Sequence, residues 1–191
     1  MQQSQRATWN HALEYAIRAA NERGVPLVVA FGITRRFPEA RKRHFAFMLE
    51  GLLDTADRLR QRGIRLVVRL SPPAQTALTL SADAALVVTD AGYLRIQRSW
   101  RRRVARSAGC RVVQVESDVV VPVGTASDKE EYAARTIRPK IHRALGRFLR
   151  PLEETRLVRS SLDLRVDGVE VLDLSGALDR LGMSQEAGTV V

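Results

Sequence analysis

The sequence predicts an α/β domain, with an open parallel sheet and helices on both of its faces. The first observation is a set of four short, valine-rich apolar segments with the length and composition of buried strands: 25–31, 64–70, 84–89 and 111–116. The second is that segments with a helical spacing of apolar residues separate them, so helix and strand alternate. Such alternation with short connections is typical of parallel sheets with right-handed crossovers.

Glycines mark the ends of the first two helices. Apolar residues recur every three or four positions over 13–20 and again over 45–59. Gly24 and Gly63 follow these segments, where a helix that ends in a left-handed residue needs a glycine. We therefore expect one helix before the first strand and a longer one between the first two strands.

The next two helices have their own boundary signals. Ser71 is expected to cap the third helix, which the proline pair 72–73 opens. The fourth helix is expected over 94–107, where Trp100 lies on the apolar face, and Gly109 follows its end.

Beyond the fourth strand, a capping box predicts a further helix. Ser127 is the expected N-cap and Glu130 the residue that returns its hydrogen bond, so that a helix runs to about Ile137. Pro139 disfavours helical geometry in the residue before it. We therefore expect a break at this proline and a second helix through Leu149.

Charge divides the chain at Pro151. Residues 1–150 carry a net charge of +14 and residues 151–191 a net charge of −4, so we expect one domain over 1–150 and a partly ordered connector over 151–191. Within the connector, the pair 167–168 suits a hairpin turn and 175–181 a short helix. The cationic body favours nucleic acid as a partner, although arginines that are merely solvated explain the same composition.

Composition excludes several classes of protein. The content of 45% hydrophobic and 27% charged residues is that of an ordinary globular chain, and the single cysteine excludes a disulfide framework. No apolar run reaches the roughly 18–20 residues of a membrane span, and the polar amino terminus lacks a signal-peptide core. We expect a cytoplasmic protein.

The usual catalytic constellations are missing from the sequence. His11, His44 and His142 lie far apart and have no partner carboxylate at metal-ligand spacing. The isolated glycines form no phosphate-binding loop, and Cys110 enters a valine-rich strand, where a buried and unreactive thiol is expected. The residues alone predict no metal site and no self-sufficient active site.

Three polar stretches are candidate binding sites. The helix over 94–107 carries six arginines, which either follow a phosphate backbone or form a solvated face. The turn 89–93 places Asp90 at the carboxyl end of a strand, where α/β domains bind small ligands, although Asp90 also suits a helix cap. The third stretch, 132–140, indicates only an arginine-rich helix junction.

Eight segments, read in order, carry a resemblance to a known family: SQR, NHALEYA, PLVVAFG, FMLEGL, LVVRL, ALVVTDAGYLRIQRSWR, VVQVESDVVVPV and ASDKEEYAARTIRPKI. The resemblance extends in unbroken order over nearly all of residues 3–149. The chain resembles the amino-terminal α/β domain of class II cyclobutane pyrimidine dimer photolyases, and the last segment is the most distinctive. The residues after Pro151 resemble the connector between the two domains of these enzymes.

The resemblance implies that the full-length protein is a carbon–carbon lyase, a deoxyribodipyrimidine photolyase. In such flavoproteins, light excites reduced FAD, which passes an electron to a pyrimidine dimer in DNA. The flavin and the damaged DNA are bound by a helical domain that this chain lacks, so we expect no FAD and no catalytic residue here, and an inactive fragment. The alternatives are a stand-alone chromophore- or nucleotide-binding module and a cryptochrome-like photosensor, both without repair activity.

The resemblance also implies a first strand that is missing before Met1. That strand is the centre of the sheet in the family, so its loss removes a hydrogen-bonding partner from both neighbouring strands. The absent flavin domain would in addition leave an inter-domain face uncovered. We therefore expect the isolated chain to be marginally stable or to self-associate.

Related photolyases hold a light-harvesting antenna chromophore in this domain, and the resemblance implies a deazaflavin- or flavin-type antenna. The expected antenna contacts are Phe31, Gly32, Ile33, Arg43 and Asp90. The expected contacts with DNA phosphates, on the arginine-rich helix, are Arg98, Arg101 and Arg102.

Overall fold

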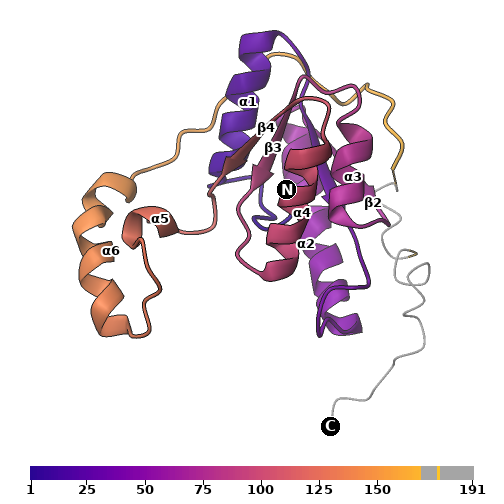
Figure 1. Cartoon of the computed structure of the whole chain (residues 1–191). Helices are drawn as coiled ribbons and strands as arrows, with labels where there is room; N and C mark the ends of the chain where they lie inside the picture. Colours follow the sequence, from indigo (N-terminus) through magenta and orange to yellow (C-terminus); the bar gives the residue numbers. More distant parts are fainter. Residues whose placement is uncertain (169–175, 177–191) are drawn as a thin grey trace.

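A computed structural model describes residues 1–168 and residue 176 of the chain, and it confirms the α/β fold class (Figure 1). Four helices and four strands alternate, and two further helices follow. The elements are α1 (His11–Arg23), β1 (Val28–Gly32), α2 (Lys42–Gln61), β2 (Arg65–Arg69), α3 (Pro73–Leu80), β3 (Leu86–Asp90), α4 (Arg95–Ser107), β4 (Arg111–Val115), α5 (Val123–Ala126) and α6 (Ala134–Phe148). No helix of the described part is long and apolar enough to span a bilayer.

The glycines expected at the ends of the first two helices are confirmed, but the expected N-cap of the third helix is wrong. Gly24 and Gly63 follow α1 and α2 with φ of 63° and 74°, which a residue with a Cβ rarely adopts. Ser71 does not cap α3, because Pro72 occupies the N-cap position. The Ser71 hydroxyl instead forms a 2.6 Å hydrogen bond with the hydroxyl of Thr76.

The main core lies between β1, β2 and the first two helices. Leu13 and Ile17 of α1 and Leu52 and Leu59 of α2 belong to one cluster of buried apolar residues with Phe31 of β1. Helices α3 and α4 contact each other, and α3 also contacts β1. Helices therefore cover both faces, as the alternating pattern predicts.

The sheet is divided into two parallel halves rather than continuous. Strand β1 pairs with β2, and β3 pairs with β4, in two separate two-stranded sheets. A cavity of about 770 Å³ separates the halves and is lined by β1 and β3. The first four residues of β3 are only half-buried, although three of them are leucine or valine.

Helices α5 and α6 form an arm that stands away from the sheet (Figure 1). The expected capping box is wrong: Ser127 is the residue after α5, and α6 begins only at Ala134. The physical reason is that the Ser127 hydroxyl accepts from Lys140 Nζ at 3.0 Å and donates to Glu131 at 2.8 Å. The expected break is also wrong, because α6 continues through Pro139.

The first part of the connector packs on the body as an extended strap. The backbone N–H of Ser161 donates to the carbonyl of Gly63 at 3.0 Å, and the Ser161 hydroxyl accepts from the N–H of Arg65 at 2.8 Å. Ser161 is fully buried and Leu157 nearly so. The strap thus covers the start of β2. The expected hairpin at 167–168 and helix at 175–181 extend into residues that lie outside the described part.

Candidate functional site

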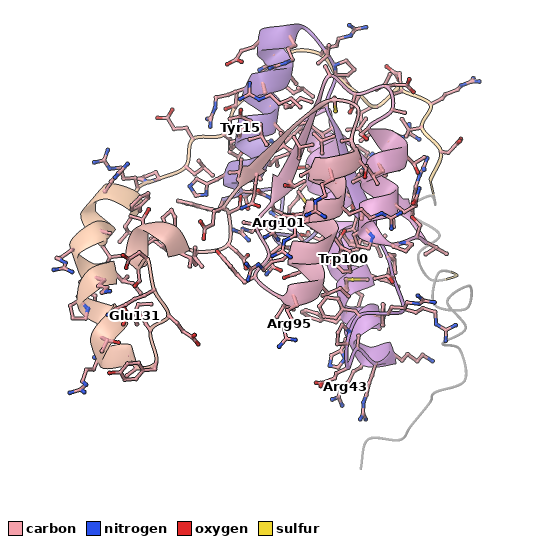
Figure 2. The ribbon with its side chains drawn as sticks, viewed as in Figure 1. Tyr15, Arg43, Arg95, Trp100, Arg101 and Glu131 are labelled. Atoms are coloured by element: carbon pink, nitrogen blue, oxygen red, sulfur yellow. The ribbon has the colours of Figure 1, made fainter. Side chains whose placement is uncertain are left out.

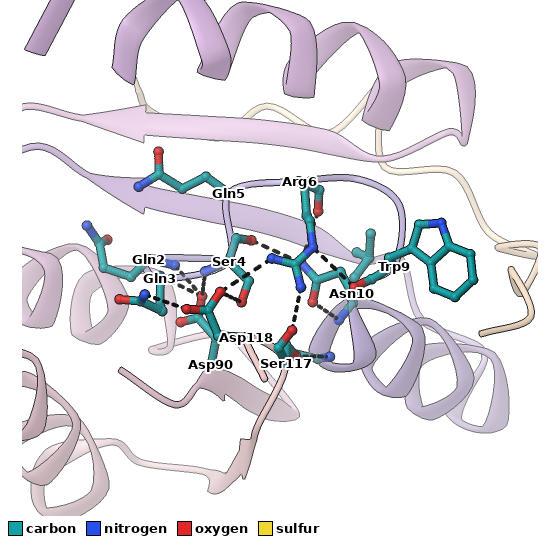
Figure 3. Close-up of polar contacts among 12 residues, drawn as sticks. Gln2, Gln3, Ser4, Gln5, Arg6, Trp9, Asn10, Asp90, Ser117 and Asp118 are labelled. Carbon is teal, nitrogen blue, oxygen red and sulfur yellow. Dashed lines mark hydrogen bonds and ion pairs between the residues drawn. The ribbon is translucent and has the colours of Figure 1, made fainter. Parts of the chain in front are cut away.

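A buried carboxylate, that of Asp90, ends β3 beside the amino-terminal segment (Figure 3). Its Oδ2 accepts hydrogen bonds from the backbone N–H groups of Gln2, Gln3 and Ser4 at 2.8, 2.7 and 2.9 Å. Three successive N–H donors around one oxygen form a cradle for an anion. Asp90 therefore holds the amino-terminal segment at the carboxyl ends of β1 and β3.

Opposing effects act on the pKa of Asp90. Burial raises the pKa, since Asp90 is only 6% exposed and its charged form loses water. The amino-terminal ammonium and the three backbone N–H groups stabilise the charged form and outweigh burial, so the pKa lies below its ordinary value. Asp90 is an ionised anchor at neutral pH. It caps no helix, because the residue before α4 is Leu94.

A second carboxylate, that of Asp118, holds the same segment from the side of β4 (Figure 3). It accepts from the side chains of Gln3 at 2.7 Å and Ser4 at 3.2 Å and pairs with Arg6 at 3.4 Å. The neighbouring Ser117 accepts a backbone N–H from the first turn of α1 at 2.7 Å. No local sequence pattern indicates Ser117 or Asp118 as a site residue, although both stand in a segment that carries the family resemblance.

The expected antenna residues at the end of β1 are in contact with other parts of the chain and are not free to contact a ligand. The side chains of Phe31 and Ile33 are 1% and 2% exposed and belong to the core. The backbone N–H and carbonyl of Gly32 are bonded to the side-chain amide of Gln2 at 3.2 and 3.1 Å. A Cβ on Gly32 would lie 2.7 Å from the Cα of Pro73. Gln2 thus brings Gly32 and Asp90 together and fills the space beside both.

Arg43 lies apart from the other expected antenna residues, in the first turn of α2 (Figure 2). Its side chain is exposed and has no hydrogen-bonding partner among residues of the described part. The loop before α2 is tied to α4, because the rings of Phe37 and Trp100 lie 6.3 Å apart. The structure therefore does not gather the five expected residues into one pocket.

The expected DNA contacts on α4 divide into two kinds. Arg98 and Arg102 are exposed to solvent. The guanidinium of Arg101 is half-buried and donates to the carbonyl of Gly92 and, at 2.9 Å, to the side chain of Gln114 (Figure 2). Arg101 therefore stabilises the turn after β3, whereas the other two arginines present unobstructed charge.

The structure adds no constellation for catalysis in the described residues. No group of three or more metal-ligating side chains is found there. The three histidines are all exposed, and His44 is engaged by the N–H of Arg41 at 2.9 Å. Cys110 is half-buried rather than fully buried, because it lies just before β4 rather than within it.

Fold and site together define a Rossmann-like α/β domain in which the amino-terminal segment covers the carboxyl ends of β1 and β3. The family model "DNA photolyase" matches residues 1–157. The chain therefore belongs to the DNA photolyase family.

Several curated relatives support this membership, and each is a deoxyribodipyrimidine photo-lyase. The protein of Methanothermobacter thermautotrophicus is 52% identical over 164 residues, which are 86% of this chain and 37% of that protein. The protein of Potorous tridactylus is 37% identical over 153 residues, or 78% of this chain and 29% of its own length. The protein of Arabidopsis thaliana is 32% identical over 153 residues, which are 78% of this chain and 31% of that protein. The chain thus spans about a third of the length of these relatives.

The similarity to solved structures is weaker than the sequence similarity to these relatives. A universal stress protein in complex with cAMP aligns with a TM-score of 0.40 and 20% identity over 62% of this chain and 94% of that chain. An isoflavone reductase aligns with a TM-score of 0.38 and 14% identity over 76% of this chain and 44% of the reductase chain. Neither likeness supports a statement about function.

Proposed function

We propose that this chain is the α/β domain of a class II photolyase that repairs cyclobutane pyrimidine dimers in DNA. The observation that carries the proposal is the 52% identity to a deoxyribodipyrimidine photo-lyase across 86% of the chain. Assignment to class II rests on the segments quoted above, most of all on ASDKEEYAARTIRPKI, and a cytoplasmic location accords with it. No observation favours a stand-alone module or a photosensor.

The repair reaction itself belongs to the part of the relatives that this chain does not span. Reduced FAD, when bound there, supplies the electron that opens the dimer after excitation by light. Trp9 and Trp100 of this chain are no substitute for an electron pathway, because they lie on separate segments and Trp9 is 60% exposed. The role proposed for the chain is structural support and, with an antenna, light collection.

An antenna chromophore of the deazaflavin or flavin type remains a proposal. Of the expected contacts, only Arg43 presents an unbonded side chain to a ligand. A ligand that touches Gly32 or Asp90 has to displace Gln2 or the backbone of residues 2–4. The residues as arranged do not fit direct contact of one chromophore with all five positions.

Damaged DNA is the partner we propose for the longer protein, and the exposed face of α4 is the first candidate contact. Arg98 and Arg102 stand on this face without a carboxylate partner in the described part of the chain. Arg101 is unsuitable for a charge-reversal test, since its guanidinium is bonded to Gly92 and Gln114.

A domain exchange tests the proposed function. Residues 1–157 replace the matching part of the Methanothermobacter photo-lyase, and light-dependent loss of pyrimidine dimers from an irradiated oligonucleotide is measured. We expect the exchanged enzyme to repair dimers in light and not in darkness, and the 191-residue chain alone to repair none. An exchanged enzyme that folds and holds flavin but leaves the dimers intact in light contradicts the proposal.

Self-association of the isolated chain is a further expectation, supported by the divided sheet. Within residues 1–168, no third strand pairs with β1 or β3, although Met1 and Gln2 bond Ala30 and Gly32 of β1, and most of β3 is only half-buried. We expect sedimentation velocity to show dimers or larger species that increase with protein concentration. A single monomer boundary over a hundredfold concentration range contradicts this expectation.

A further inference from the structure

Helix α6 has a cationic face that the family resemblance and the α4 candidate do not explain. The helix contains no acidic residue. Four of its arginines are exposed and recur at spacings of three to five residues: Arg135, Arg138, Arg143 and Arg147. They extend over 12 residues, or roughly 18 Å of helix. No residue of α6 is fully buried, although Arg143 and Arg147 line a hollow together with residues 124–128.

These arginines have no carboxylate partners, unlike the last arginines of α2. Arg58 pairs with Asp54 at 2.9 Å and Arg60 with Asp57 at 3.1 Å. In contrast, the guanidinium groups of Arg135, Arg138 and Arg143 form no ion pair or hydrogen bond among the described residues. That of Arg147 lies 5.0 Å from the centre of the Phe148 ring.

The carboxylate of Glu131 in the arm is bonded to Lys140 and Ser127 rather than to the four arginines. Glu131, labelled in Figure 2, accepts from Lys140 Nζ and from the Ser127 hydroxyl, and its side chain is 5% exposed. These bonds lower the pKa of Glu131 to about 2, Lys140 contributing most. The same contacts hold α5 against α6. Glu131 therefore neutralises Lys140 rather than the four arginines, and the exposed Asp128, which lines the same hollow as Arg143 and Arg147, forms no ion pair with either of them.

The composition of this face distinguishes between two kinds of partner. Protein interfaces depend on large apolar or aromatic residues at their centre. Between its arginines, the exposed face of α6 carries only small, rigid or polar residues such as Pro139, His142 and Gly146. A phosphate backbone needs no such apolar centre, since charge and hydrogen bonds to phosphate supply the affinity.

We propose that the exposed face of α6 binds the phosphodiester backbone of DNA. A length of roughly 18 Å spans several phosphates, since successive phosphates of one strand rise about 3.4 Å along the DNA axis. Four guanidinium groups over this length can each contact a different phosphate. The proposal deepens the proposed function, on which it rests for the choice of DNA, and it names a contact surface separate from α4.

Binding of undamaged duplex DNA by the 191-residue chain tests this proposal. A fluorescently labelled 20-base-pair duplex is titrated by anisotropy at several salt concentrations, with the wild-type chain and with a variant in which Arg135, Arg138, Arg143 and Arg147 are changed to Gln. We expect the variant to bind at least 30-fold more weakly at low salt. We also expect its plot of log K against log salt to be shallower by about 3.6, because roughly 0.9 counterions are released for each of the four phosphate contacts.

A matched variant separates local contact from net charge. It removes four exposed arginines from four separate segments, by changing Arg18, Arg36, Arg111 and Arg165 to Gln. We expect this variant to lose less than fivefold in affinity. Replacing the four α6 arginines by Lys should keep most of the affinity, since lysine retains the charge, and far-UV circular dichroism should show the same helix content in all variants.

The outcomes distinguish this proposal from the proposed function. Equal losses in the α6 variant and the matched variant, or no measurable binding of duplex by the wild-type chain, overturn the α6 proposal. Neither result concerns light-dependent repair, which the domain exchange measures. Conversely, loss of repair in the exchanged enzyme with α6-dependent binding intact overturns the proposed function alone.

Discussion

Replacing Glu14 by Ala is expected to destabilise the domain by about 3–5 kcal/mol, because it leaves a buried guanidinium without its counter-charge. Glu14 is 1% exposed and pairs with Arg62 at 2.7 Å, while its second oxygen accepts the N–H of Thr155 at 2.6 Å. Arg62 also donates to the carbonyls of Ala7 at 2.7 Å and Thr155 at 3.1 Å. One ion pair thus joins the amino-terminal segment, α1, the end of α2 and the connector.

Thermal unfolding of the Glu14→Ala variant measures this effect, and we expect the Tm to fall by roughly 10 °C. The matched control is Asp54→Ala, which removes the exposed partner of Arg58 on α2 and should cost less than about 1 kcal/mol. Trypsin should also cleave the variant sooner at Arg156 or Arg159, since the connector loses its anchor. Equal Tm values for the two variants contradict the prediction.

Replacing Asp90 by Asn is expected to cost about 2–3 kcal/mol at neutral pH, since hydrogen bonds to a charged acceptor contribute more than neutral ones. The carboxylate receives three backbone N–H groups of the amino-terminal segment. With Asn, the amide oxygen still accepts, but the negative charge that faces the amino-terminal ammonium is lost. We expect loosened packing of residues 1–4 and a lower Tm.

The pH dependence provides an independent measurement of the same group. The pKa of Asp90 is lowered in the folded state, so its stabilising contribution is complete above the unfolded pKa of about 3.9 and is lost as the pH falls through the folded value. Urea unfolding between pH 6 and pH 2.5 should therefore show a shallower loss of stability in Asp90→Asn than in the wild type. The control is Asp83→Asn, at an exposed aspartate, which should keep the wild-type profile.

Local sequence patterns predicted the alternation of helix and strand correctly, because apolar spacing and helix-ending glycines act over only a few residues. All four strands and the first four helices occur where those patterns indicate, and Gly24 and Gly63 adopt the left-handed conformation that their positions suggest. The family resemblance, carried by residues throughout the first 149 positions, likewise needed no coordinates.

Local patterns failed where a side chain has a partner elsewhere in the fold. Ser127 matches a helix cap in sequence, but Lys140 and Glu131 take up its hydroxyl, so the helix begins later. Asp90 and Arg101 match ligand contacts, yet both are bonded to the backbone of neighbouring segments.

The arrangement around the connector depends entirely on packing. Glu14 and Thr155 are separated by 141 positions, and nothing in either local sequence indicates that they meet. Likewise, each strand is recognisable by itself, but which edges pair and which stay open depends on how helices and strands assemble. Short-range preferences determine which segments become helices and strands. Contacts between residues far apart in the sequence determine where charged side chains and free strand edges lie, because such contacts form only when the whole chain folds.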